Sequence, residues 1–125
     1  CIFLLNAGHE TTSNLIGNGT HALMTQRDQL ERLVAEPALI GSAVEELLRY
    51  ESPLQLNNRL AAEAIEISDR VIPAGTFITL CIGAANRDAA EFADAERLDI
   101  TRKPNNHLAF GQGAHACSGM NVARM

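Results

Sequence analysis

The stretch Phe110-Gly111-Gln112-Gly113-Ala114-His115-Ala116-Cys117-Ser118-Gly119 places three glycines around one cysteine, and residues 117–125 are expected to begin a helix. Glycine lets the backbone approach a flat ligand closely and adopt positive φ. A cysteine at a helix N-terminus has a thiolate that the helix dipole stabilises. The stretch is therefore typical of a metal-ligand loop. The alternative is a glycine-rich turn that holds a buried structural cysteine.

The segments before this loop predict helices followed by a short sheet. Apolar residues at helical spacing predict helices over residues 1–24, 27–36 and 37–50, with Pro37 separating the last two. Alternating apolar residues predict a small sheet over residues 57–82, and residues 83–109 are expected to be mostly loop. We therefore expect a mainly α fold with a small β-sheet (α+β), forming one partial domain over residues 1–125. Both ends of the chain look cut.

Charge and cysteine usage exclude several classes of protein. The formal net charge of −5, without a basic stripe, disfavours nucleic acid and anionic membranes as partners. The longest apolar run, from Cys1 to Leu5, is far shorter than the roughly 20 residues that span a bilayer. Three cysteines without a close-spaced pair are neither a disulfide framework nor a zinc ribbon. A cytoplasmic protein is expected.

The first helix carries an unusual polar segment, Ala7-Gly8-His9-Glu10-Thr11. Glycine in the middle of a helix costs about 1 kcal/mol relative to alanine, so Gly8 requires a reason. One reason is close approach of a ligand, with Thr11 bonding back to the carbonyl of Ala7 and loosening the helix. The other is close helix packing at Ala7-Gly8 beside an exposed polar turn. Both remain open on the residues alone.

Glu46 and Arg49 lie three residues apart on the helix predicted over residues 37–50, at the border of its apolar stripe. As a surface pair they would contribute under about 1 kcal/mol. If the pair is buried, the loss of one member costs several kcal/mol, because the other member is left unpaired. The spacing alone does not decide between the two.

The cysteine loop resembles the haem-binding loop of the cytochrome P-450 family, whose pattern Phe-x-x-Gly-x-x-x-Cys-x-Gly is met at Phe110, Gly113, Cys117 and Gly119. The resemblance implies haem b (iron protoporphyrin IX) as cofactor, with Cys117 as the thiolate ligand of the iron. It implies further that Phe110 packs near the sulfur and that His115 meets a haem propionate. Ser118 departs from the usual leucine.

Other segments resemble motifs of the soluble, bacterial members of the same family. These motifs occur in the same order as in the C-terminal part of the family. By this resemblance Ala7 and Gly8 border the cofactor, and Glu10 and Thr11 deliver protons during oxygen activation. The resemblance also implies a structural network of Glu46 and Arg49 with Arg97. It implies an arginine that clamps a haem propionate, which is Arg59 here. Two departures are Ala64, in place of the common aspartate, and Asp69, in place of glycine at a turn expected to need left-handed backbone.

The activity that the resemblance implies is insertion of one atom of O₂ into a small organic substrate. Electrons from NAD(P)H would arrive through a ferredoxin-type donor. Two alternatives stay open: an inert fragment that cannot hold haem alone, and a peroxygenase that uses H₂O₂, although such relatives typically replace the pair found here at Glu10-Thr11. A zinc site of His107, His115 and Cys117 would still need a fourth ligand, or an open site, and would leave the glycines unexplained.

Overall fold

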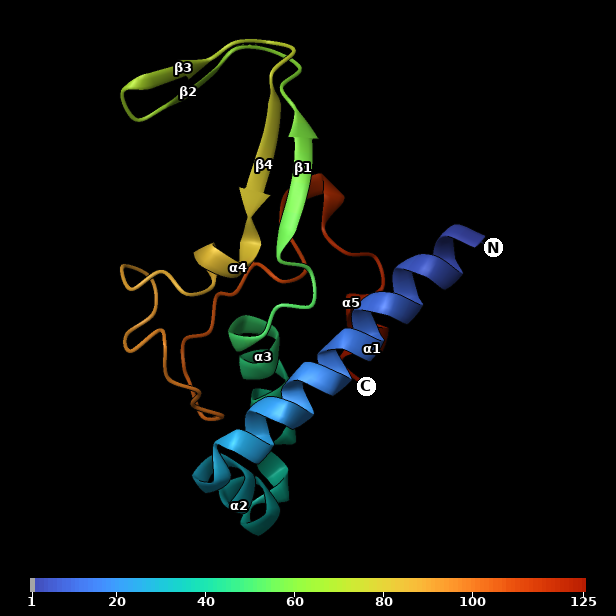
Figure 1. The fold of residues 1–125 in the computed structure, drawn as a ribbon, viewed down its shortest axis with the longest axis vertical. Coiled ribbons are helices and arrows are strands. Elements are labelled where there is room, and N and C mark those ends of the chain that lie inside the picture. Colours follow the sequence, from blue (N-terminus) through green and yellow to red (C-terminus); the bar gives the residue numbers. More distant parts are fainter. Residues whose placement is uncertain (1) are drawn as a thin grey trace.

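The computed structural model describes residues 2–125 and confirms the expected α+β class. Cys1, where the apolar run of the sequence starts, lies outside the described residues. Two small antiparallel sheets follow three helical segments, and a long irregular stretch leads to the cysteine loop (Figure 1). None of the helices in this part of the chain combines the length and the apolar character that crossing a membrane requires.

The first helix, α1 (Ile2–Thr25), packs against α2 (Arg27–Ala35) and α3 (Ile40–Tyr50) through its C-terminal half. Gly19 and Ala22 are its buried residues. A Cβ at Gly19 would lie 3.1 Å from Cδ1 of Leu47, so a small residue there lets α1 approach α3 closely. The N-terminal half of α1 projects away from the other helices (Figure 1).

The helix expected over residues 37–50 forms in two parts. Pro37–Leu39 is a single 3₁₀ turn, η1, and α3 begins at Ile40. Proline suits this position because its fixed φ matches the first turn of a helix and the N–H that it lacks would have had no partner there. Along α3, four residues are fully or nearly fully buried: Ala43, Glu46, Leu48 and Arg49. The apolar stripe of α3 therefore carries a charged pair into the core.

The expected single sheet is two separate two-stranded sheets. Strand β1 (Leu56–Leu60) pairs with β4 (Phe77–Cys81), and β2 (Ile65–Ile67) pairs with β3 (Arg70–Ile72), both antiparallel. The β2–β3 turn places left-handed backbone at Ser68, with φ 54°, and not at Asp69 as expected. Asp69 does not have positive φ, so this turn does not need the glycine that relatives commonly have at this position.

The last strand ends one residue earlier than expected, at Cys81. Ile82, expected to extend a strand, instead begins the short helix α4 (Ile82–Ala85). Its side chain is buried, and the Gly83 N–H donates to the carbonyl of Gln55 at 3.1 Å, so the chain leaves β4 by turning back onto the start of β1. The irregular stretch that follows, residues 86–109, supplies much of the core through Phe92, Ala95, Leu98 and Ile100.

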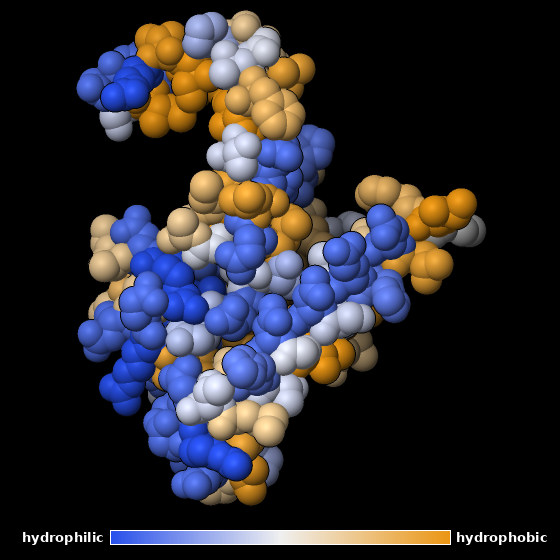
Figure 2. Space-filling view, viewed as in Figure 1, coloured by the Kyte–Doolittle hydropathy of each residue, from blue (hydrophilic) through white to orange (hydrophobic). Residues whose placement is uncertain are grey.

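Much apolar surface is left uncovered by the described residues. Exposed apolar side chains gather at the N-terminal end of α1 and along the strands, as Figure 2 shows, and include Ile2, Phe3, Leu60, Val71 and Phe77. A folded protein rarely exposes large contiguous apolar patches. These faces therefore bear on whether residues 1–125 can be stable by themselves.

Candidate functional site

The cysteine loop has the backbone that its glycines predict. Gly111 and Gly113 adopt φ of 68° and 75°, a region that L-residues with a side chain rarely enter. The N–H of Cys117 donates to the carbonyl of Phe110 at 2.8 Å, and that of Gly111 donates to Leu108 at 2.8 Å. Residues 113–115 form a 3₁₀ turn, η2. The loop is thus folded back on itself, with the cysteine backbone tied to its first residue.

Within residues 2–125 Cys117 is exposed, which disagrees with the alternative of a buried structural cysteine. The helix after it starts later than expected: α5 spans Met120–Ala123, and Gly119 precedes it as the cap. The Cys117 carbonyl accepts from the N–H of Met120 at 3.3 Å. The cysteine therefore lies one turn before the helix, and the folded loop, more than a helix dipole, sets its orientation.

The polar segment of the first helix behaves as expected at Thr11, whose hydroxyl donates to the Ala7 carbonyl at 2.8 Å. Packing does not explain Gly8, because a Cβ built there would have no atom of the described residues within 4 Å apart from its chain neighbours and the backbone of its own helix. Glu10 is exposed beside it. Of the two explanations for the glycine, helix packing within residues 2–125 is therefore wrong, and approach of a ligand stays as a prediction.

The two residues expected at the propionates, Arg59 and His115, lie on different elements. Arg59 is on β1, opposite Ile78 of β4, and its guanidinium donates to Asn57 Oδ1 and to the Asn58 carbonyl, both at 2.8 Å. His115 ends the η2 turn, two residues before the cysteine. Both side chains are exposed and free of ion pairs within residues 2–125. Their role at a cofactor stays a prediction.

Glu46 and Arg49 form a buried pair, with 0% of either side chain exposed. Arg49 Nε and Nη2 donate to the two carboxylate oxygens at 2.8 Å each. The remaining N–H groups of Arg49 donate to the carbonyls of Asn86, Ala95 and Arg97 at 2.8, 2.8 and 3.1 Å. All five guanidinium donors are therefore used, which is what a buried arginine requires.

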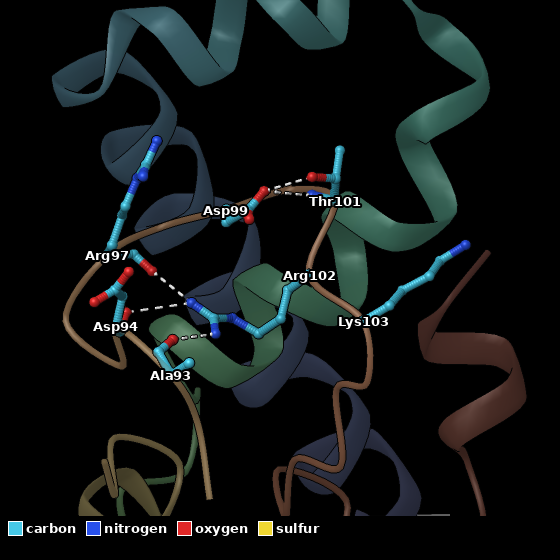
Figure 3. Close-up of a pocket in the computed structure, with 7 residues that line it drawn as sticks. All are labelled: Ala93, Asp94, Arg97, Asp99, Thr101, Arg102 and Lys103. Atoms are coloured by element: carbon cyan, nitrogen blue, oxygen red, sulfur yellow. Dashed lines mark hydrogen bonds between the residues drawn. The ribbon is translucent and has the colours of Figure 1, made fainter.

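The third member of this network, and its second cation, is Arg102 and not Arg97. Arg102 Nε lies 3.1 Å from both oxygens of Glu46, and its side chain is 10% exposed. Figure 3 shows the Arg97 side chain directed away from Arg102, while the Arg97 carbonyl accepts from Arg102 Nη2 at 3.1 Å. The path of the irregular segment turns Arg97 outward, so this residue contributes its backbone only. Glu46 also accepts from the Asp99 N–H and from Asn105 Nδ2.

The pocket around these residues, about 300 Å³ in volume, is lined by Ala93, Asp94, Arg97, Asp99, Thr101, Arg102 and Lys103 (Figure 3). Arg102 already donates to Glu46 and to the carbonyls of Ala93, Asp94 and Arg97. The pocket is therefore a by-product of this packing. Neither Arg102 nor Asn105 carried a signal in the sequence, because residues 86–109 have no periodicity from which a direction could be read.

A zinc site does not assemble in the described part of the chain, where no three metal-binding side chains cluster. His107 is engaged elsewhere: Nε2 lies 3.0 Å from Glu45 Oε2, and Nδ1 accepts from the Ala109 N–H at 3.2 Å. Cys117 therefore offers a lone sulfur donor, exposed on a glycine loop. Such a donor fits a metal whose other ligands belong to a cofactor, as in haem, better than a closed protein site.

Comparison with known proteins agrees with this site. The family model described as Cytochrome P450 matches residues 1–125. The chain is 50% identical over 125 residues to the biotin biosynthesis cytochrome P450 of Bacillus subtilis, covering 100% of this chain and 32% of that protein. It is 50% identical over 125 residues to the vitamin D(3) 25-hydroxylase of Pseudonocardia autotrophica, covering 99% of this chain and 31% of that protein.

Solved structures give the same result. The crystal structure of P450BioI with an acyl carrier protein ligated to hexadec-9Z-enoic acid superposes with a TM-score of 0.96 at 51% identity, over 99% of this chain and 32% of that one. Substrate-free CYP109E1 from Bacillus megaterium gives a TM-score of 0.96 at 45% identity, over 98% of this chain and 32% of that one. The chain thus spans about a third of the length of these relatives. With its family model matched throughout and its fold shared with these structures, the chain belongs to the cytochrome P450 family.

Proposed function

We propose that the full-length protein is a haem-thiolate monooxygenase that inserts one atom of O₂ into a small organic substrate. The observation that carries the proposal is the exposed Cys117 thiol on a loop whose glycines hold positive φ and whose backbone is tied to Phe110. The family membership of the chain supports the same reaction class.

In this proposal haem b lies against the cysteine loop. Cys117 holds the iron as a thiolate, Phe110 packs near the sulfur, and the glycines Gly111, Gly113 and Gly119 keep the loop thin enough for a flat cofactor. Arg59 and His115 donate to the propionates, for which the planar fork of arginine is well suited. When bound, the haem supplies the oxygen-binding and oxidising chemistry, which a thiolate ligand favours by donating electron density.

Glu10 and Thr11 move protons to the reaction site. The Thr11 hydroxyl donates to Ala7 in the resting arrangement, so its oxygen is left to accept a hydrogen bond from water or from a proton donor. Glu10, which is exposed, can exchange protons with solvent. A proton delivered by Glu10 is passed on when Thr11 releases its bond to the Ala7 carbonyl. The same pair argues against a peroxygenase, which receives both protons with H₂O₂ and needs none delivered from solvent.

Electrons come from NAD(P)H through a ferredoxin-type donor, and the protein is cytoplasmic in this proposal. Among the structures compared, one relative is bound to an acyl carrier protein and another, CYP109E1, to corticosterone. These molecules differ so widely that we assign only the class of small organic substrates to the protein.

The test is the carbon monoxide difference spectrum of the reduced full-length protein. We expect a band of the thiolate-ligated type, which Cys117→Ser abolishes. Cys81→Ser is the matched control, because Cys81 is the other free cysteine among the described residues and is also exposed. A thiolate-type band that survives Cys117→Ser would refute the assignment. Incorporation of one labelled oxygen atom from O₂ into product, driven by NAD(P)H and a ferredoxin, then separates a monooxygenase from a peroxygenase.

For residues 1–125 alone we propose that haem is not held. The support is the apolar surface at the N-terminal end of α1 and along the strands, where Phe3, Leu60 and Phe77 are 81%, 67% and 68% exposed. Burial of such side chains supplies roughly 1.5 to 3 kcal/mol each, and here that contribution is missing. The same difference spectrum, measured on the isolated 125-residue chain, checks this: a thiolate-type band would show the proposal to be wrong.

A further inference from the structure

Glu45 connects the two ends of the cysteine loop. Its side chain, on α3, meets His107 before the loop and Arg124 after it. Arg124 Nε lies 2.5 Å from Glu45 Oε1, and Nη2 lies 3.0 Å from Oε2, so the pair is bidentate. His107 Nε2 lies 3.0 Å from Oε2. One carboxylate therefore holds both chain segments that flank the loop at residues 110–119.

The hydrogen bonds of His107 fix its protonation state. Its Nδ1 accepts from the Ala109 N–H at 3.2 Å, so this nitrogen carries no proton, and the proton on Nε2 is donated to Glu45. The imidazole side chain is only 3% exposed, and this burial lowers the pKa of His107, in agreement with a neutral ring. The pKa of Glu45 is lowered by the hydrogen bond from Arg124, so its carboxylate is charged.

Both partners of Glu45 also contact Phe110, the first residue of the loop. The Arg124 guanidinium carbon lies 4.7 Å from the centroid of the Phe110 ring, and the His107 and Phe110 ring centroids are 6.0 Å apart. The Phe110 carbonyl in turn accepts from the N–H of Cys117 at 2.8 Å. A continuous chain of contacts thus leads from the α3 carboxylate to the backbone of the cysteine.

We propose that Glu45, acting through His107 and Arg124, is a positioning residue that holds the Cys117 loop in the geometry needed for thiolate ligation. This Glu45 network (Glu45, His107 and Arg124) is separate from the buried Glu46 pair, which faces residues 86–105. The inference rests on the proposed haem ligation by Cys117. Without Glu45, the Arg124 guanidinium and the His107 ring beside Phe110 lose the carboxylate that holds them, and the Phe110 carbonyl that accepts from Cys117 can move.

The experiment uses the cofactor-loaded full-length protein and the variants Glu45→Gln, Arg124→Gln and the double variant. The amide of glutamine keeps the shape of the side chain but cannot accept both Arg124 donors and His107 as a carboxylate does. Arg124 is partly exposed, so its variant is the milder change and serves if Glu45→Gln does not fold. The matched control is Glu36→Gln, which removes an exposed carboxylate paired with Arg32 at 3.9 Å, away from the loop.

The first readout is the rate at which the thiolate-type carbon monoxide band converts to the thiol type in mild denaturant. We expect conversion to be about tenfold faster in Glu45→Gln, the effect of a partly exposed pair worth a little over 1 kcal/mol. The double variant should be no faster than the faster single variant, because both act through one contact. The midpoint of global unfolding, followed by circular dichroism, should match that of Glu36→Gln.

Three results would overturn the inference: conversion as slow as in Glu36→Gln, additive effects in the double variant, or a fall in the global unfolding midpoint that accounts for the faster conversion. The last would make the network merely structural. The wild-type protein separates this inference from the proposed function. If it shows no thiolate-type band at all, the haem ligation itself is wrong, whereas a normal wild-type band with unaffected variants refutes only the role of Glu45.

Discussion

Removal of the Arg102 side chain tests the buried charge network most directly. Arg102 donates to both oxygens of Glu46, a carboxylate with no exposed surface. In Arg102→Ala the carboxylate keeps Arg49, so its charge is not left wholly unpaired, and the cost falls at the low end of the 3–5 kcal/mol for a broken buried pair. The carbonyls of Ala93 and Asp94 that lose a donor are at exposed bonds and regain water. We therefore expect a loss of about 3 kcal/mol.

The assay is urea-induced unfolding of the cofactor-loaded full-length protein, followed by far-ultraviolet circular dichroism. Arg97→Ala is the matched control, since the exposed Arg97 side chain makes no hydrogen bond or ion pair within residues 2–125, and it should change the free energy of unfolding by less than about 0.5 kcal/mol. Arg102→Lys should fall between the two, because lysine keeps the charge but not the fork of donors. If Arg97→Ala costs as much as Arg102→Ala, the assignment of Arg102 as the second cation of the network is refuted.

Three further predictions concern the site and its supports. Thr11→Ala should raise the peroxide released per NAD(P)H consumed. Thr25→Ala, which loses a similar hydrogen bond to a helix carbonyl, should not. An unchanged product yield in Thr11→Ala would contradict the role of Thr11 in proton delivery. Gly111→Ala should lower the free energy of unfolding by about 1 kcal/mol, because Gly111 has positive φ. Gly41→Ala, in a helix, should be neutral or stabilising. If both variants changed the free energy of unfolding equally, backbone strain at position 111 would be excluded as the cause. Burial lowers the pKa of His107, so on acidification below about pH 6.5 the unfolded chain binds that proton first and the free energy of unfolding falls. His107→Asn should flatten this fall, and an unchanged pH profile would show that His107 is not its source.

Helices and the cysteine loop were predictable because their signals are local. The apolar stripe of α3 depends on residues three and four positions apart in the sequence. The glycines of the loop depend only on the backbone conformation at their own positions. The observed φ values at Gly111 and Gly113 confirm this for the loop. The remaining errors are shifts of one to three residues along the chain. The last helix begins at Met120 and not at Cys117, and the left-handed residue of the turn is Ser68 and not Asp69.

Ion-pair partners that lie far apart in the sequence could not be predicted from such local patterns. Glu45 and Arg124 are 79 residues apart, and Glu46 reaches Arg102 over 56 residues. Which arginine of the irregular segment turns inward depends on the path of a backbone that has no repeating period. Arg97 was the natural candidate by resemblance, yet its side chain points to solvent (Figure 3).

By itself, the sequence determined the class of fold, the resemblance to the family and the glycine-rich backbone of the Cys117 loop, because these depend on periodicity and on a motif contained within ten residues. Tertiary structure decided that Arg102 completes the buried network and that Glu45 joins both sides of the Cys117 loop. The physical reason is that a buried charge selects whichever donors the folded chain brings within hydrogen-bonding distance, and that distance exists only after folding.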